Sequence, residues 1–252
     1  MNLIKSKKLI KFNNLSHGFF NKIGGASDGI YNSLNCGLGS KDKKINILKN
    51  LKIVKKKIGS KKNNLILLHQ IHSNKFHFIN KIPKKKLAGD GLVTKKRNIA
   101  LSILTADCAP ILIYDNKIKM IGAIHAGWKG AYKKIIIRTL KYFLKKGSNK
   151  KNIVVVIGPC IGQKNYEIKS DFFKKFIKLD KNNRIFFKKI KKKTFFSLKD
   201  YLKGQIRSLG INNIEIINKD TYNTKNNFFS SRRSLHNNYK DYGRNITTIM
   251  IK

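Results

Sequence analysis

Residues 98–127, NIALSILTADCAPILIYDNKIKMIGAIHAG, decide the fold, because three short apolar runs follow one another there. NIALSIL, APILIYD and IKMIGAIHAG each have the length and the Ile and Leu content of a β-strand. Asp115 and Asn116 supply a turn between the last two runs, which are therefore expected to pair as a hairpin. An antiparallel hairpin at the centre of the chain favours mixed sheets over a purely parallel one.

Helical and strand-like patterns alternate on both sides of this stretch. Ile45, Leu48, Leu51 and Val54 recur every three or four residues and predict a helix over 44–59. Helical spacing returns between residues 128 and 144. Further strands are expected at LILLHQIHS (65–73), NIVVVIGPCIG (152–162), IEIIN (214–218) and NITTIMI (245–251), and helix N-caps at Ser170 and Ser197.

Taken together, these patterns predict an α+β or mixed α/β sandwich. The chain has only three prolines and no Pro- or Ser-rich linker, so we expect a single domain over residues 1–252. A hydrophobic content of 41% is that of a folded protein. No apolar run reaches the roughly 18 residues of a membrane span. The opening segment lacks the apolar core of a secretory signal.

The three cysteines, Cys36, Cys108 and Cys160, lie far apart in the sequence and form no CxxC pair. A sparse, odd set argues against a disulfide framework and for a reducing compartment. We therefore expect a cytoplasmic protein, in which any special cysteine is a nucleophile or a metal ligand.

The formal net charge of +44 raises the question of nucleic-acid binding. Only seven of the 56 basic residues are arginine, the residue that base recognition favours. The lysines run through the whole chain beside abundant Asn and Ile, and these three residues share A/T-rich codons. A genome-wide nucleotide bias therefore explains the charge, and a nucleic-acid partner is not expected.

Three segments place a metal-binding side chain near a predicted strand end: HQIH with His69 and His72, ADC with Cys108, and HAGW with His125. Three N or S ligands with an open fourth position suit a catalytic zinc. The segments are separate, so spacing alone leaves open that these side chains are simply packed. Two histidines three apart on an extended segment face opposite ways, which favours His72 as the ligand. His69 or Gln70 would then orient the site.

A rival interpretation makes Cys108 a nucleophile and His125 its base, with Asp107 as the orienting group. Such a protein would be a metal-free cysteine hydrolase. Asp107 is also the nearest candidate acid or base, or equally a structural carboxylate that caps the turn. The HExxH and zinc-deaminase signatures do not occur.

Two further segments could bind an anion. The glycine-rich loop 22–40 could turn its main-chain N–H groups toward one, with Lys22 adding charge, although an ordinary surface loop has the same composition. FFSSRRS (228–234) places Arg232 beside Arg233. On a strand, one of the two would face inward and could clamp phosphate or carboxylate.

In order and spacing, a set of motifs along nearly the whole chain resembles the laccase-domain family. Its members are described as multicopper polyphenol oxidases, as zinc-dependent purine nucleoside phosphorylases and adenosine deaminases, and in some bacteria as peptidoglycan editing factors. The motifs are GGASDGIYNSLNCG, HQIHS, GDGLVT, LTADCAPILIYD, IGAIHAGWKG, IGPCIGQKNYEI, FFSSRR and the Gly243-Arg244 pair.

The resemblance implies a zinc ion held by His72, Cys108 and His125, with copper as the alternative metal. The implied activities are phosphorolysis of adenosine, inosine, guanosine or 5′-methylthioadenosine, and deamination of adenosine. Purine nucleosides and phosphate are the implied partners, and a homodimer is compatible with the family. The residues it places at the reaction are Cys108 and Asp107 as catalytic groups and Lys22, Asn35, Lys129 and Arg232 as substrate-binding groups.

The sequence departs from the family pattern at three positions. Lys22 and Lys129 stand where members usually have arginine, and Ser231 replaces a common tyrosine. Lysine keeps the charge but lacks the bidentate fork of arginine, which puts phosphate geometry at these positions in doubt.

A metal-free cysteine amidase acting on cell-wall precursors is the alternative function.

Overall fold

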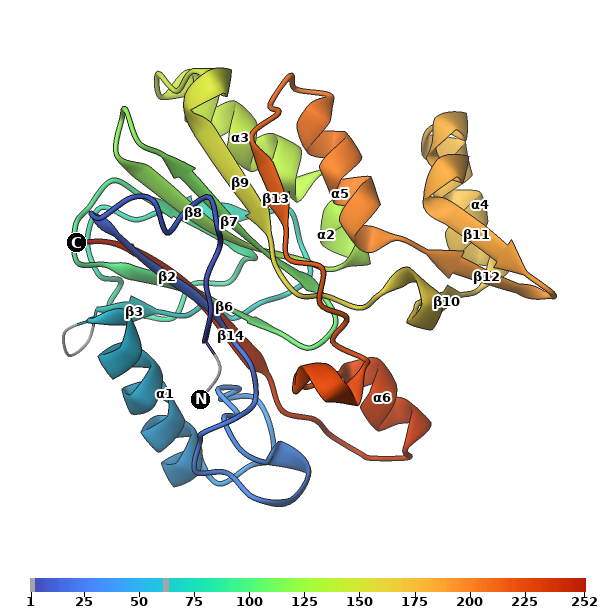
Figure 1. Ribbon diagram of the computed structural model, residues 1–252, viewed down its shortest axis with the longest axis horizontal. Coiled ribbons are helices and arrows are strands. Elements are labelled where there is room, and N and C mark those ends of the chain that lie inside the picture. The colour runs from blue at the N-terminus through green and yellow to red at the C-terminus, as the bar shows by residue number, and fades with distance from the viewer. Residues whose placement is uncertain (1–2, 61–63) are drawn as a thin grey trace.

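The computed structural model describes residues 3–60 and 64–252, so the first two residues of the opening segment and residues 61–63 lie outside it (Figure 1). The strands are β1 (Leu3–Ile4), β2 (Leu15–Phe20), β3 (Leu65–Ile66), β4 (Phe76–Phe78), β5 (Gly91–Thr94), β6 (Ala100–Thr105), β7 (Ala109–Asp115), β8 (Met120–Ala126), β9 (Ile153–Ile157), β10 (Glu167–Ile168), β11 (Phe187–Ile190), β12 (Lys193–Phe196), β13 (Ile214–Ile216) and β14 (Asn245–Ile251). The helices are α1 (Lys44–Ile58), α2 (Trp128–Tyr132), α3 (Ile135–Lys145), α4 (Ser170–Leu179), α5 (Leu198–Arg207) and α6 (Ser231–His236).

Within the described residues the strands form two large sheets and a small one. The first has the order β1-β2-β14-β6-β3, the second β13-β9-β7-β8-β5-β4, and the small one β10-β12-β11. The predicted hairpin is confirmed, with β7 antiparallel to β8 from Ala109 opposite Ala126 to Asp115 opposite Met120. Parallel pairs such as β9 with β13 lie in the same sheet, so the expectation of mixed sheets is also confirmed.

The first strand within residues 98–127, β6, belongs to the five-stranded sheet and not to the sheet of the hairpin. β6 pairs with β14, whereas β7 and β8 lie in the six-stranded sheet. The chain therefore crosses from one sheet to the other within the three residues 106–108. This short crossing fixes Cys108 at the junction of the two sheets.

The molecule has four layers, which follow from the period of two in its central strands. Leu112 and Tyr114 of β7 face the other sheet, while Ile111 and Ile113 face the helical layer. α3 and α5 cover that outer face, and α1 covers the outer face of the five-stranded sheet (Figure 1). The small sheet and α4 project to one side of this body (Figure 1).

The helix predicted over 44–59 is present, but its buried face differs from the expected one. Ile45 and Leu48 are 58% and 48% exposed. The buried side chains of α1 are Ile47, Asn50, Leu51, Val54 and Ile58, so only Leu51 and Val54 of the four predicted residues lie on the buried face. The prediction failed here because Asn50 lies on the buried face, where its side chain bonds the 26–35 loop.

Three other sequence expectations need correction, and the N-cap position of Ser197 is confirmed. The strand expected over 65–73 is limited to β3, and the chain then runs as a loop toward His72. The helical spacing after Trp128 covers two helices, because Lys134 takes a left-handed conformation between α2 and α3. Ser170 is the first residue of α4 and not its cap, whereas Ser197 occupies the N-cap position of α5 but its hydroxyl bonds Asp200.

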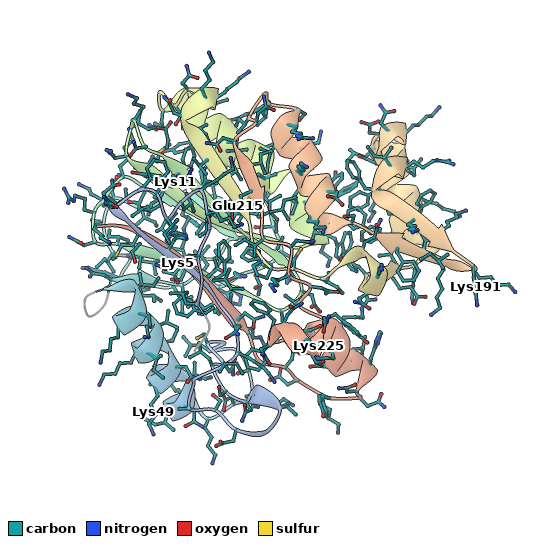
Figure 2. All side chains as sticks on the ribbon, in the orientation of Figure 1. Lys5, Lys11, Lys49, Lys191, Glu215 and Lys225 are labelled. Carbon is teal, nitrogen blue, oxygen red and sulfur yellow. The ribbon has the colours of Figure 1, made fainter. Side chains whose placement is uncertain are left out.

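The lysines project from widely separated parts of the surface. Figure 2 shows Lys49 on α1 and Lys191 in the β11–β12 turn at opposite margins of the molecule, and Lys225 near α6 between them. This distribution agrees with a chain-wide enrichment in lysine. Among the described residues, no helix is long and apolar enough to cross a membrane.

His17 ties the amino-terminal segment to β2 and is expected to make stability depend on pH. Its ring is 1% exposed, and its Nε2 accepts a hydrogen bond from the Ser6 N–H at 2.9 Å. Burial, helped by Lys5 and opposed by Glu215, lowers the pKa of His17 to about 4. The folded protein therefore keeps His17 neutral at pH values where the unfolded chain already binds a proton.

We expect the free energy of unfolding to decrease as the pH falls from about 6.5 to about 4, by on the order of 2–3 kcal/mol from this residue. Urea denaturation at a series of pH values measures the slope. His17→Gln keeps an acceptor for Ser6 and removes the titration, so its slope should be shallower over this interval. Equal slopes for the two proteins would contradict the assignment.

Candidate metal centre

Cys108 lies in the crossing between the two sheets, directly before β7. Asp107 takes a left-handed conformation with φ of 83°, which aspartate tolerates better than most residues. The tight crossing turns Asp107 and Cys108 toward different neighbours. The Asp107 carboxylate bonds the segment around α6, and the Cys108 thiol faces two histidines.

His125 is 3% exposed and stands near the end of β8, across from Asp90. Its Nδ1 lies 2.8 Å from a carboxylate oxygen of Asp90, and its main-chain N–H donates to the Asp90 carbonyl. Burial raises the pKa of Asp90, but hydrogen bonds from His125 and Ser73 outweigh it and bring the pKa to about 2. The ionised carboxylate accepts the Nδ1–H of His125, so Nε2 is the ring nitrogen that faces Cys108 and His72 and could bind a metal.

The same carboxylate shapes the loop that carries His72. Asp90 accepts hydrogen bonds from the main-chain N–H groups of His72 and Ser73 and from the Ser73 hydroxyl, at 3.0, 2.6 and 2.7 Å. Gln70 fastens the loop to β6 by exchanging two bonds with the main chain of Leu104. Of the two residues predicted to orient the site, Gln70 bonds the loop in this way, and His69 is exposed.

The predicted triad comes together at this point. The donor atoms of His72, Cys108 and His125 all lie within 4.8 Å of one another, and Cys108 Sγ is 3.9 Å from His72 Nε2. The two imidazole rings meet edge to face, with centroids 4.7 Å apart. Two imidazole nitrogens and one thiolate can hold a metal ion, and this donor set suits zinc.

The electrostatics of the cluster favour ionisation of its thiol. Burial opposes ionisation of Cys108, but His125 and His72 together lower the pKa of its thiol below the ordinary value. Burial likewise lowers the pKa of His125, while Cys108 and Asp90 raise it above its usual range. The thiolate that these neighbours stabilise is the form that binds metal.

Gly127 leaves the space in which the ligands meet. A Cβ on Gly127 would lie 2.7 Å from Cys108 Sγ and 3.1 Å from His72 Cδ2. Its backbone, with φ of −76°, is one that alanine adopts without strain. The requirement for glycine is therefore set by the ligand cluster and not by the turn.

Gly127→Ala is accordingly expected to lower zinc affinity by about tenfold or more while the protein stays folded. Metal content after dialysis against a buffered zinc series measures the affinity, and thermal denaturation checks the fold. Gly122→Ala is the matched control on β8, because its Cβ would make ordinary contacts of 3.4 Å with Phe143. Equal zinc affinity in both variants would show that the ligand cluster accommodates a Cβ at Gly127 and would contradict the prediction.

Two cavities open beside Cys108. One, of about 270 Å³, is bordered by all three side chains of the cluster and by Lys86, Tyr242 and Arg244. The other, of about 180 Å³, is bordered by Cys108, Tyr166 and Arg232. Tyr166 and Arg232 also border a larger groove of about 620 Å³ lined by Trp128 and Phe172. The centre is thus accessible from two sides.

Arg232 and Arg233 lie at the start of α6 and not on a strand. The Arg232 guanidinium stands 5.5 Å from the centre of the Tyr166 ring and donates to the Glu167 carbonyl at 2.9 Å. The Arg233 guanidinium donates to the main-chain carbonyls of Thr221, Tyr222 and Phe228. The two arginines therefore differ, since Arg232 borders the smaller cavity beside Cys108 and Arg233 borders neither cavity.

Asp107 is held by three hydrogen bonds. Its carboxylate accepts from the Thr221 and Ser230 hydroxyls at 2.7 and 2.9 Å and from the Arg232 N–H at 2.7 Å. Burial raises the pKa of Asp107, and these bonds oppose the rise. This arrangement fastens α6, and with it Arg232, to the crossing that carries Cys108.

The other three predicted substrate-binding residues do not border either cavity beside Cys108. The side chain of Asn35 is buried, bonding Ser40, Asp42 and the main chain of Gly37 and Arg244. Lys22 lies beside Arg233, and burial together with that arginine lowers the pKa of Lys22. Lys129 is exposed, with its Nζ 5.7 Å from the centre of the Trp128 ring.

Sequence reasoning missed three residues of the site: Asp90, Tyr166 and Arg244. Asp90 had a local signal, because a carboxylate between two glycines directly precedes a strand in GDGLVT. Arg244 was visible only as part of the Gly243-Arg244 motif. Tyr166 was visible only as part of the IGPCIGQKNYEI motif, since its place in the site depends on how the chain before β10 returns toward α6.

The fold and the site together define a mixed α/β protein with a His-Cys-His metal-binding cluster between two sheets. Residues 16–252 match the family described as multi-copper polyphenol oxidoreductase laccase, and the chain belongs to this family. The relatives support an enzymatic role through their names.

Two sequence relatives are named purine nucleoside phosphorylase. The one from Rickettsia prowazekii is 34% identical over 199 residues, which are 76% of this chain and 80% of the relative. The one from Bacteroides thetaiotaomicron is 30% identical over 241 residues, 90% of this chain and 89% of the relative. The crystal structure of YfiH from Bacillus licheniformis has a TM-score of 0.88 at 29% identity, covering 95% of this chain and 94% of that one.

Proposed function

We propose that the protein is a zinc-dependent purine nucleoside phosphorylase that converts adenosine, inosine, guanosine or 5′-methylthioadenosine to the free base and a ribose 1-phosphate. The observation that carries this proposal is the convergence of His72, Cys108 and His125 beside two cavities. The names of the relatives give the reaction class. Deamination of adenosine at the same centre is proposed as a second activity.

In this proposal the chain provides three ligands and their support. His72, Cys108 and His125 hold the ion, and Asp90 keeps His125 in the required tautomer. A bound zinc ion supplies Lewis-acid polarisation of a substrate oxygen and activation of water. Cys108 is then a ligand and not a free nucleophile.

The groove on the far side of Arg232 suits the purine ring. Trp128 and Phe172 have ring centres 5.1 Å apart, and Tyr166 lies next to Phe172 at 6.3 Å. Aromatic side chains stack on purines regardless of their exocyclic groups, which fits a broad nucleoside range. Arg232 also lines this aromatic groove, and Asp107 positions Arg232 by accepting its main-chain N–H. The proposal gives Lys22, Asn35 and Lys129 no direct contact with substrate.

The direct test is an assay of metal-quantified protein with adenosine, with and without phosphate, followed by chromatography of the products. Adenine that forms only with phosphate would support phosphorolysis, and inosine would support deamination. The absence of both from zinc-loaded protein would reject the proposal. A chelator separates the cysteine-amidase alternative, because it should abolish zinc chemistry and spare a thiol nucleophile.

A further inference from the structure

The larger of the two cavities beside Cys108 carries positive charge on its walls. It is bordered by every side chain of the ligand cluster, and the other charged residues on its walls are Lys86 and Arg244. No aspartate or glutamate is among the residues that border it. An anion in this cavity would meet both cations and lie next to the ligand cluster.

Arg244 presents one edge of its guanidinium without a partner. Its Nη1 donates to the Asp241 carboxylate at 3.1 Å and to the Tyr242 carbonyl at 2.6 Å, which uses both hydrogens of that nitrogen. The three remaining N–H donors, on Nε and Nη2, have no acceptor among the described residues. This edge is the one that pairs with two oxygens of a phosphate group.

The surrounding loops hold Arg244 in place before any ligand arrives. Its guanidinium stands 4.4 Å from the centre of the Tyr242 ring. A Cβ on Gly37 would lie 2.3 Å from Arg244 Cδ, so the stem passes directly over that glycine. Asn35 accepts the main-chain N–H of Arg244 at 2.9 Å. A group fixed in this way loses little freedom on binding.

The other arginines near the centre are less suited to an anion. The guanidinium of Arg233 already donates hydrogen bonds to three main-chain carbonyls. Arg232 borders a cavity that neither histidine of the cluster reaches, and Glu167 and Asp171 border the groove beyond it. Lys169 and Lys175 border that groove as well, so its charge is mixed, whereas the cavity beside Arg244 has no carboxylate on its walls and Asp241 orients Arg244 from outside it.

We propose that Arg244 forms an oxyanion subsite at the metal centre and binds the phosphate co-substrate through its Nε–Nη2 edge. This inference rests on the proposed phosphorolysis. In that reaction an oxygen of hydrogen phosphate bonds to the ribose anomeric carbon as the bond to the purine nitrogen breaks. The bonding pair leaves with the purine, which takes up the proton that hydrogen phosphate loses. Asn35 acts as a positioning residue for Arg244.

The test compares Arg244→Gln and Arg244→Lys with the wild type, all zinc-loaded. We expect the KM for phosphate to rise about 10- to 100-fold in Arg244→Gln, with Arg244→Lys between it and the wild type. The KM for adenosine should stay within about twofold. Arg207→Gln, on the exposed end of α5, removes one charge elsewhere and should leave both values unchanged. An unchanged phosphate KM in both Arg244 variants would overturn the inference.

Calorimetric titration of inorganic phosphate at constant ionic strength separates this inference from the proposed function. Saturable binding by the wild type that weakens about 10- to 100-fold in Arg244→Gln supports the subsite even if no phosphorolysis is seen. Equal binding by the two proteins rejects the subsite even if phosphorolysis is confirmed. Arg244→Lys keeps the stem over Gly37, so it decides the question if Arg244→Gln does not fold.

Discussion

Replacing Cys108 by alanine is expected to lower the rate of adenosine phosphorolysis about a thousandfold or more and to abolish stoichiometric zinc binding. The thiolate is one of three ligands, and its loss leaves two imidazoles that cannot hold the ion at ordinary concentrations. Lewis-acid stabilisation is worth several kcal/mol in the transition state, which corresponds to a factor of this size. Product chromatography and metal analysis of the same sample measure both effects.

Two further variants complete this experiment. Cys160→Ala removes a different buried thiol, whose pKa is raised by burial, and should retain zinc and activity. His72→Ala tests the rival mechanism, because a Cys108 nucleophile served by His125 has no need of His72. Full activity of His72→Ala, or of Cys108→Ala itself, would rule out a catalytic metal held by this triad.

Asp90→Asn is expected to weaken zinc binding about 10- to 100-fold and to destabilise the fold by about 3 kcal/mol. The carboxylate is fully buried and accepts bonds from His72, Ser73 and His125. An amide at this position directs N–H hydrogens toward some of these donors, so His125 loses the partner that fixes its tautomer. Zinc titration with a chromophoric competitor and urea denaturation of metal-free protein report the two effects separately.

Asp115→Asn is the matched control for this change. Asp115 is equally buried at the opposite end of the β7–β8 hairpin, where it accepts the main-chain N–H groups of Lys117 and Ile118. An asparagine can accept the same two bonds, so zinc affinity should be unaffected. A loss of stability in Asp90→Asn without any change in zinc affinity would assign Asp90 a purely structural role.

The sequence was sufficient to predict the strands whose side chains are nearly all buried and apolar. The β7–β8 hairpin and the buried strands follow from runs of Ile and Leu bounded by turn residues. α1 shows the limit of this reasoning, because its buried Asn50 serves the 26–35 loop and shifts the apolar face away from Ile45 and Leu48. A side chain that bonds a distant segment leaves no trace in the local period.

The three segments of the triad could be singled out because thiol and imidazole are rare and chemically distinctive in this chain, and the family resemblance then implied that they hold a metal. Its supporting residues are common types whose role depends on tertiary contacts. Asp90 matters because β5 and β8 are neighbours, and Arg244 because the 35–37 loop lies against the residues before β14. Neither neighbourhood can be read from residues close in sequence.

The two cavities beside Cys108 share only Ala106 and Cys108 among the residues that border them. In the proposed reaction, phosphate would enter beside Arg244 and the nucleoside through the aromatic groove. Neither substrate then blocks the path of the other, so binding has no obligatory order. Such an enzyme can bind either substrate first. Its turnover in the cell would then be limited by whichever of the two substrates is scarcer.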